Sequence, residues 1–254
     1  LLLGQMQTLS EVAYYRAAVP VAEMNGVVMA SFTLLYTPTA ARLFARGNYA
    51  GINKLYWQTA AWMSVVAFPI FVSTFSLARP VIRLLYGSRY DRSAFVLALL
   101  ALGSYFNATL GFNVQTLKVI GRLRYVIVTS LLAALANIAL NLFLIPRYGA
   151  VGAAVGATMA IVGYNLLLQL GLRQAPEFKA FDPSYCSIYS VTAVSAVGLL
   201  LLQCATSIGL SGALPLAGGV SVLVLLVSKK KLNITATFPE LHRLPFMRAL
   251  LTTE

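Results

Sequence analysis

Long runs without a charged side chain alternate with short basic segments along the chain. Five runs lack Asp, Glu, Lys and Arg altogether: residues 55–78, 93–117, 125–146, 148–172 and 183–228. A helix needs about 20 apolar residues to cross the ~30 Å hydrocarbon core of a bilayer, and the last run is long enough for two. The pattern predicts membrane-spanning helices over 56–78, 93–117, 124–145, 150–172, 186–207 and 212–228, and a less apolar one over 12–37.

The composition supports this interpretation. Hydrophobic residues make up 59% of the 254 residues and charged residues 10%, whereas soluble domains are about 45–50% apolar and about 25% charged. The net charge is +12, but nucleic-acid-binding proteins carry such charge on a solvated face, so no nucleic-acid partner is expected. Charge-free runs of this length favour helices over the short strands of a membrane barrel. The predicted fold is all-α: a polytopic transmembrane helical bundle of about seven spans.

The basic residues predict an orientation. Thirteen of the nineteen Lys and Arg fall in the loops after 12–37, 93–117 and 150–172, or in the tail 229–254. Cytoplasmic loops are enriched in these residues, so the C-terminus is predicted to be cytoplasmic and residue 1 external. An external start without an initiator Met indicates the C-terminal part of a longer polytopic protein. Residues 78–92 mix four Arg with apolar side chains and are expected to form an amphipathic segment at the membrane interface.

One predicted span carries a polar stripe. At 100° per residue, Ser104, Asn107, Gly111, Gln115 and Lys118 share an arc of about 80°. Polar groups are costly in hydrocarbon, so the stripe is expected to face protein or a water-filled cavity. Two interpretations stay open: hydrogen bonding between helices, and lining of a substrate path.

The first span holds an ionisable pair. Arg16 and Glu23 are seven residues apart, on one face of a helix that Pro20 is expected to bend. Ionisable residues within a span are functional candidates. An interfacial Arg16 that extends its charge into water, with Glu23 hydrogen-bonded between helices, explains the pair equally well.

Two further spans carry polar or small residues at helical spacing. Asn137 and Asn141 lie on one face and suit either a helix contact or a substrate path. Gly152 and Gly156 permit two helix backbones to approach closely. The sequence contains no Cys/His cluster with metal-ligand spacing, P-loop, GxGxxG or GxSxG motif, so no metal, cofactor or catalytic residue is expected.

Three segments carry a family resemblance. They are EVAYYRAAVPVAEMNGVVMASFTLLYTPTAARLFARGN (11–48), ARPVIRLLYGSRYDRSAFVLALLALGSYF (78–106) and IPRYGAVGAAVGATMA (145–160). These segments resemble the bacterial O-antigen and exopolysaccharide flippases of the multidrug/oligosaccharidyl-lipid/polysaccharide exporter superfamily. The similarity runs over about residues 1–172 and weakens beyond them.

The resemblance implies a 14-span transporter of two lobes around a central cavity. Residues 1–172 would belong to the C-terminal lobe, 173–228 would form the remaining two transmembrane helices, and 229–254 a basic cytoplasmic tail. Such flippases move undecaprenyl-pyrophosphate-linked oligosaccharide across the bacterial cytoplasmic membrane by alternating access, without a cofactor. They act beside the glycan polymerase and glycosyltransferases of the same pathway. Arg16 and Lys118 are the cations in these spans that could meet a pyrophosphate.

Other functions compete with this one. A cation-coupled multidrug antiporter of the same superfamily would be expected to use buried carboxylates, and Glu23 is the acid that these spans offer. A polytopic glycan polymerase or ligase usually needs a sizeable external loop with acids, His or Arg, and the interhelical segments here are short. A purely structural membrane scaffold stays open. The sequence therefore favours a transporter that is not an enzyme.

Overall fold

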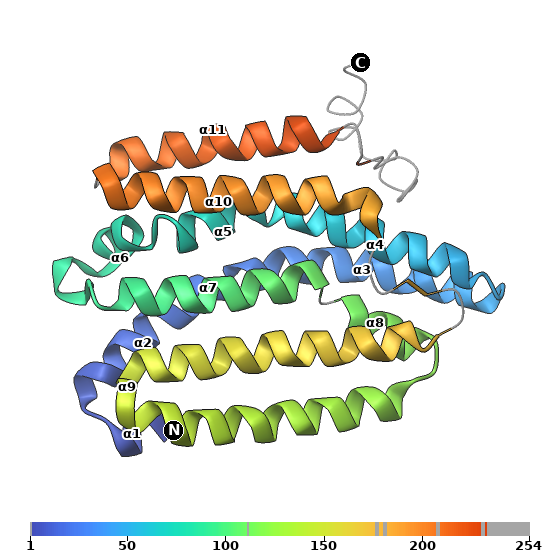
Figure 1. Cartoon of the computed structure of the whole chain (residues 1–254), viewed down its shortest axis with the longest axis horizontal. Coiled ribbons are helices and arrows are strands. Elements are labelled where there is room, and N and C mark those ends of the chain that lie inside the picture. Colours follow the sequence, from blue (N-terminus) through green and yellow to red (C-terminus); the bar gives the residue numbers. More distant parts are fainter. Residues whose placement is uncertain are drawn as a thin grey trace.

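The computed structural model describes residues 2–110, 112–175, 178–179, 182–206, 209–229 and 232. In these ranges every regular element is a helix (Figure 1). The α-helices are α1 Leu2–Met6, α2 Leu9–Ala22, α3 Met24–Ala45, α4 Tyr49–Val66, α5 Phe68–Phe75, α6 Ala78–Tyr86, α7 Ser93–Leu110, α8 Phe112–Val119, α9 Leu123–Arg173, α10 Cys186–Thr206 and α11 Leu210–Lys229. Two short 3₁₀ helices, η1 Ser88–Tyr90 and η2 Pro183–Tyr185, complete the order.

The first predicted span is longer than expected and is broken. Helices α2 and α3 together make an apolar stretch over Leu9–Ala45, where the sequence predicted 12–37. Glu23 is the single residue between them, and its N–H donates to the Val19 carbonyl at 3.0 Å. Pro20 lies within α2 and has no N–H to donate, which weakens the helix at that point. The break at Glu23 comes three residues after Pro20, the residue that was expected to bend this helix.

The second predicted span is a bent pair of helices. Helix α4 begins at Tyr49, where the side chain of Asn48 accepts a hydrogen bond from the Gly51 N–H at 2.7 Å and so caps the helix. The axis turns by 48° between α4 and α5. Pro69 lies in the first turn of α5, a position that tolerates the missing N–H.

Helix α9 is a hairpin of two arms. Gly149 has φ of 55° and ψ of −131°, a conformation outside the helical region that glycine adopts readily. The arms on either side of it, 123–148 and 150–173, run side by side in Figure 1. The Tyr125 hydroxyl donates to the Leu167 carbonyl at 2.5 Å, which joins them. These arms correspond to the spans predicted over 124–145 and 150–172.

The number of spans remains a prediction. Four helical stretches of the described chain are long and apolar enough to cross a membrane, or five if α4 and α5 form one span. The 51-residue α9 counts once in this number, although Gly149 divides it. Helix α11 contains a shorter apolar stretch, Leu214–Ser228. For the described residues the structure thus confirms an all-helical fold with several membrane-length helices, and the total of seven spans and the two-lobed context stay predictions.

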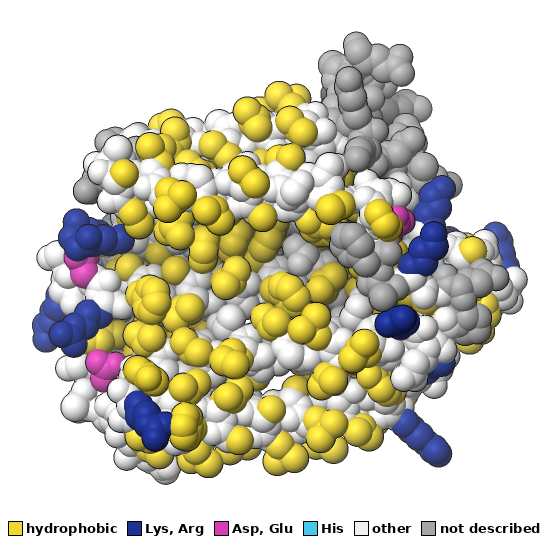
Figure 2. All heavy atoms as spheres, viewed as in Figure 1, with side chains coloured by type: hydrophobic (Ala, Val, Ile, Leu, Met, Phe, Trp, Pro, Cys, Tyr) yellow, Lys and Arg dark blue, Asp and Glu magenta, His cyan; other side chains and the backbone are white. Residues whose placement is uncertain are grey.

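The surface has the distribution of a membrane protein. Figure 2 shows apolar side chains over the middle of the molecule and Lys and Arg side chains gathered toward its two ends. Large apolar residues are exposed on several helices, for example Leu135, Leu201 and Leu226 at 60–64%. Such extensive exposed apolar surface marks a lipid or protein contact.

The core is divided among several helices. Tyr36, Trp57, Phe112 and Leu168 belong to one buried cluster, which joins α3, α4, α8 and α9. A second cluster joins α4 and α5 to α10 and α11, and the Ser76 hydroxyl of the α5–α6 turn donates to the Ala196 carbonyl at 2.8 Å. The helices of the predicted 173–228 region therefore pack on the preceding bundle. Of the predicted basic tail 229–254, residues 230–231 and 233–254 lie outside the described residues.

Candidate functional site

The polar stripe of α7 meets an asparagine of the second α9 arm. Asn165 donates through Nδ2 to the Oδ1 of Asn107 at 3.0 Å. Asn113 of α8 donates to the backbone carbonyl of Asn165 at 3.1 Å and to its Oδ1 at 3.3 Å. Asn113 and Asn165 are fully buried, and Asn107 is half-buried. Three uncharged amides thus join α7, α8 and α9 inside an apolar bundle.

The amide cluster of Asn107, Asn113 and Asn165 is not fully satisfied. The Oδ1 atom of Asn113 is buried without a hydrogen-bond partner among the described residues. A buried polar atom left unpaired costs about 1–3 kcal/mol. The cluster therefore joins helices and also holds unused hydrogen-bonding capacity in the interior.

Two neighbouring contacts extend this polar region. The hydroxyls of Tyr36 in α3 and Thr116 in α8 lie 2.5 Å apart. The Tyr56 hydroxyl of α4 donates to Oε1 of Gln169 in α9 at 2.7 Å. Tyr36, Tyr56 and Thr116 are fully buried. Hydrogen-bonded tyrosines and amides therefore lie along the inner faces of α3, α4, α8 and α9.

The other members of the predicted stripe are placed differently. Ser104 and Gln115 are half-buried, and Lys118 is exposed near the end of α8. Asn107 also approaches the Met29 sulfur of α3 at 4.0 Å. For Asn107 the structure shows the interhelical hydrogen bond that was one of the two interpretations of the stripe. Whether Ser104 and Gln115 line a substrate path stays a prediction.

Arg16 borders a hollow between α1 and α2. The hollow has a volume of about 780 Å³ and is also lined by Gln5, Tyr15 and Pro20. Arg16 is exposed and lies about 10 Å along the axis from the first residue of α2. Among the described residues it has no hydrogen-bond or ion-pair partner, so its guanidinium is available to an anion.

Glu23 lies at the break between α2 and α3 and is exposed. No ion pair with Arg16 is found in the part of the chain that the structure describes. Arg16 and Glu23 therefore do not form the expected pair: Arg16 lies beside the hollow, and Glu23 lies at the junction of α2 and α3.

Asn137 and Asn141 bond to each other. The Asn141 Nδ2 donates to Oδ1 of Asn137 at 2.6 Å and to its carbonyl at 2.9 Å. The other arm is close: a Cβ at Gly156 would lie 3.0 Å from Oδ1 of Asn141. A Cβ at Gly152 would collide with the carbonyl of Leu144. Both glycines therefore lie where the two α9 arms approach closely.

The predicted residues do not form one site. Arg16 belongs to α2 and Lys118 to α8, and these two helices lie toward opposite ends of the bundle (Figure 1), so the two cations do not form a joint anion site. Asn137 and Asn141 lie on the first, outer arm of α9, whereas Asn165 of the amide cluster lies on the second arm. No group of three or more potential metal ligands occurs among the described residues.

Asn113 and Asn165 were not predicted from the sequence. On an ideal helix Asn113 lies about 120° from Asn107 and therefore outside the stripe. The chain is not one ideal helix there, because α7 ends at Leu110 and α8 begins at Phe112. A signal was available for Asn165, since Asn165 and Gln169 are four residues apart on one face of an otherwise apolar helix.

Comparisons with known proteins agree with the helical transporter interpretation. Residues 1–95, from α1 into α7, match the model of the family described as "Polysaccharide biosynthesis protein". A protein of Shigella flexneri named "Putative O-antigen transporter" is 22% identical over 160 residues, which cover 63% of this chain and 38% of that protein. No solved structure matches. The chain is thus similar, over part of its length, to a polysaccharide biosynthesis family and to a protein named as an O-antigen transporter, of which it spans less than half.

Proposed function

We propose that the protein is a multi-pass transporter of the bacterial cytoplasmic membrane that moves a lipid-linked oligosaccharide to the external leaflet. The observation that carries this proposal is the match of residues 1–95 to a polysaccharide biosynthesis family, in a chain whose helices are long and apolar. The similarity to an O-antigen transporter points to the same class of cargo. An undecaprenyl-pyrophosphate-linked glycan has the required chemistry.

The interior of the bundle suits an uncharged, hydroxyl-rich cargo. Side-chain amides and hydroxyls are the groups that hydrogen-bond sugars, and the buried polar groups of α3, α4, α7, α8 and α9 are of these two kinds. The unpaired Oδ1 of Asn113 is one such acceptor. We propose that a rearrangement of the bundle opens this polar region to the glycan.

Arg16 is the proposed contact for the pyrophosphate. It lies within the first apolar stretch, borders a hollow and has no described partner. The proposed movement is alternating access, in which this bundle and a second lobe rock about a site near the membrane midplane. The lipid tail would stay in the bilayer, and no covalent step is involved.

The competing functions have less support. A cation-coupled drug antiporter would be expected to hold buried carboxylates, and Glu11, Glu23, Asp91 and Asp182, the carboxylates that the structure describes, are half-buried or exposed. A polymerase or ligase would act on the glycan chemically. Neither alternative accounts for the O-antigen transporter relative as directly as a flippase does.

Deletion of the gene separates these functions. Loss of a flippase should lower surface polysaccharide while complete lipid-linked oligosaccharide accumulates in the membrane. Loss of a polymerase should leave single repeat units on the surface, and loss of a drug antiporter should change sensitivity to cationic drugs with normal surface polysaccharide. Either of the last two results would overturn the proposal.

Variants of the same gene test the two proposed contacts. Gln115→Leu is the cleaner test of the substrate path than Asn107→Leu, because Asn107 also joins α7 to α9. It should lower export with a normal protein level. Arg16→Ala should lower export more than Arg16→Lys does, whereas the exposed Arg124→Ala is a matched control without effect. Wild-type export from both Arg16 variants would remove the anion contact.

A further inference from the structure

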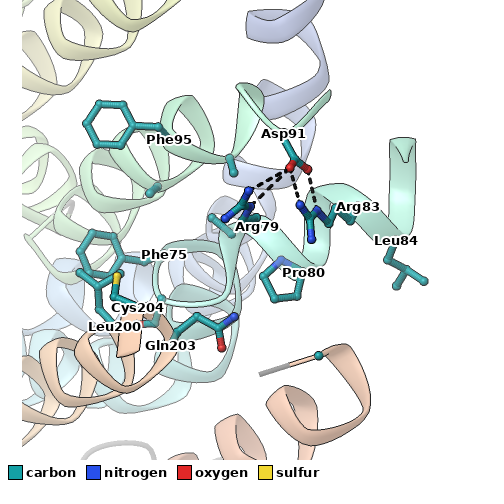
Figure 3. A pocket seen from close by; sticks show the side chains of 15 residues that line it. Phe75, Arg79, Pro80, Arg83, Leu84, Asp91, Phe95, Leu200, Gln203 and Cys204 are labelled. Atoms are coloured by element: carbon teal, nitrogen blue, oxygen red, sulfur yellow. Dashed lines mark hydrogen bonds and ion pairs between the residues drawn. The ribbon is translucent and has the colours of Figure 1, made fainter. Parts of the chain in front are cut away.

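A second cavity lies at one end of the bundle, apart from the amide cluster. It has a volume of about 720 Å³ and lies between the end of α5, helix α6, the start of α7 and the end of α10 (Figure 3). Its upper rim carries Arg79, Arg83 and Asp91, and Gln203 lies on the α10 side. The cavity thus combines a charged mouth with the ends of four helices.

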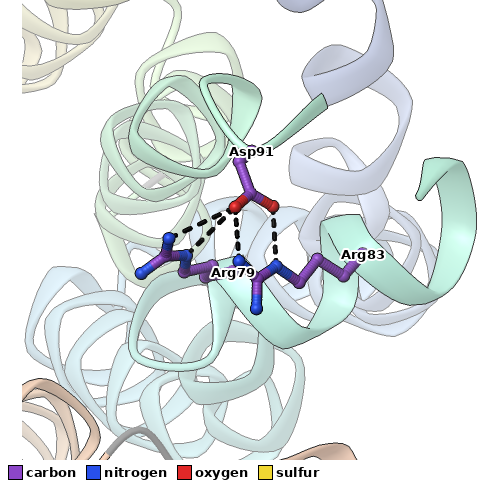
Figure 4. A network of polar contacts seen from close by, with 3 residues as sticks. All are labelled: Arg79, Arg83 and Asp91. Atoms are coloured by element: carbon purple, nitrogen blue, oxygen red, sulfur yellow. Dashed lines mark hydrogen bonds and ion pairs between the residues drawn. The ribbon is translucent and has the colours of Figure 1, made fainter. Parts of the chain in front are cut away.

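The two arginines share one carboxylate in a defined geometry (Figure 4). Arg83 donates through Nε to Oδ1 of Asp91 at 2.7 Å and through Nη2 to Oδ2 at 2.6 Å. Arg79 donates through Nε and Nη2 to the same Oδ2 at 3.4 and 3.2 Å. The Nη1 group of each guanidinium makes no bond with a described residue. Asp91 therefore orients both arginines and leaves N–H donors on each of them.

The charge of this group favours an anion. Hydrogen bonds from Arg83 and then Arg79 hold the pKa of the Asp91 carboxyl at about 2, so it is ionised at neutral pH. Two guanidinium groups against one carboxylate leave a charge of +1. The neighbouring Arg89 and Arg92 are exposed and add to it. Guanidinium groups are well suited to phosphate oxygens because their donors are planar and paired.

The walls of the cavity are apolar. Phe75 and Leu200 lie below the arginines in Figure 3, and Phe95 lies above them to the left; all three line the cavity. Helix α6 also exposes Leu84 and Leu85, at 65% and 52%, beside its arginines. An amphipathic helix of this kind lies at the boundary between headgroups and acyl chains, and Figure 2 shows Lys and Arg side chains clustered at this end of the apolar surface.

We propose that this cavity binds an anionic phospholipid of the bilayer, with its phosphodiester on Arg79 and Arg83 and an acyl chain along Phe75, Phe95 and Leu200. The charged rim accounts for the phosphate and the apolar wall for the chain. A free phosphate would use the rim alone, which is exposed to solvent and screened by salt. The site is separate from the proposed glycan path, because none of its residues belongs to the amide cluster or borders Arg16.

Lipid binding to the purified full-length protein tests the proposal. Native mass spectrometry would follow phosphatidylglycerol and phosphatidylcholine added to the protein in neutral detergent. We expect one phosphatidylglycerol to bind at least about tenfold more tightly than phosphatidylcholine. The double variant Arg79→Gln with Arg83→Gln should lower the affinity for phosphatidylglycerol about thirtyfold and so remove that preference. This figure assumes that each arginine contributes about 1 kcal/mol, as a basic residue does at an anionic membrane. Arg124→Gln, an exposed cation in the first turn of α9, is the matched control and should change nothing.

Two further arms distinguish a lipid site from a structural ion pair and from a site for free phosphate. Asp91→Asn removes the negative charge but keeps one oxygen that can accept from the arginines, so phosphatidylglycerol binding should be retained or become tighter. If the arginines serve only a structural ion pair, Asp91→Asn should instead be as damaging as the double arginine variant. Excess inorganic phosphate should leave the bound lipid in place. Equal binding of both lipids, a damaging Asp91→Asn or displacement by phosphate would each overturn the proposal. None of these readouts depends on glycan transport.

Discussion

Asn165 is the residue on which the helix packing around the amide cluster depends most. Replacement by Leu keeps a side chain of similar size but removes the bond to Asn107 Oδ1 at 3.0 Å and the contact from Asn113 Nδ2 at 3.3 Å. The bond from Asn113 to the backbone carbonyl at 3.1 Å remains. Asn165→Leu therefore removes the side-chain part of the junction between α7, α8 and α9.

The expected cost follows from these contacts. Interhelical hydrogen bonds in membrane proteins contribute on average about 0.6 kcal/mol and at most about 1.7 kcal/mol each. Polar atoms left unpaired in a buried position add about 1–3 kcal/mol. We therefore expect Asn165→Leu to lower the free energy of unfolding by about 2–4 kcal/mol.

Equilibrium unfolding of the purified protein in mixed micelles would measure this loss. Asn137→Leu is the matched control, because the Asn137 side chain bonds to Asn141 of its own helix and is half-buried on the outer α9 arm. Its loss should cost about 0.5 kcal/mol, as for a single helix-surface pair. Equal destabilisation by the two variants would refute the assignment of Asn165 as the junction.

Three other predictions concern the α9 hairpin and the segment between α6 and α7. Gly152→Ala should lower the free energy of unfolding by about 1–3 kcal/mol, since the added Cβ would collide with the other arm of α9. Gly163→Ala is its control: the added Cβ has open space, and the variant should raise the free energy of unfolding by about 0.4–1 kcal/mol. Similar thermal shifts for the two variants would contradict close packing at Gly152. Gly149→Ala should cost about 1–3 kcal/mol because φ is 55°, and its unfolding midpoint checks this. Because the pKa of Asp91 is lowered, its ion pairs stabilise the fold at pH values above the ordinary pKa of 3.8, and this stabilisation is lost as the pH falls through about 2. Arg83→Gln should raise the pKa of Asp91 in a carbon-detected NMR titration. An unchanged pKa would contradict the geometry.

The positions of the helices were largely predictable from the sequence. Charge-free runs reflect the cost of charge in hydrocarbon, so they located 124–145, 150–172 and 186–207 close to their observed places. The breaks were less predictable. Pro20 signalled the α2–α3 break, but a bend of 48° at Ala67 and the extension of the first apolar stretch to Ala45 depend on packing against other helices.

The polar interior was predicted only in part. Asn107 was found because it belongs to a stripe on its own helix. Asn113 and Asn165 become neighbours through the meeting of α8 and α9, and periodicity within one helix carries no information on that meeting. The Asp91 carboxylate similarly gains its two arginines only when η1 folds back over α6 (Figure 4).

Translocation by the purified full-length protein tests the central claim most directly. Vesicles would be made with a lipid-linked oligosaccharide in both leaflets, and an impermeant glycosidase would be added outside. In protein-free vesicles about half of the glycan is protected, as for any lipid spread over two leaflets. We predict that vesicles containing the protein lose this protection over time and that Arg16→Ala slows the loss. Continued protection of the inner half, in intact vesicles with correctly folded protein, would contradict the proposed function.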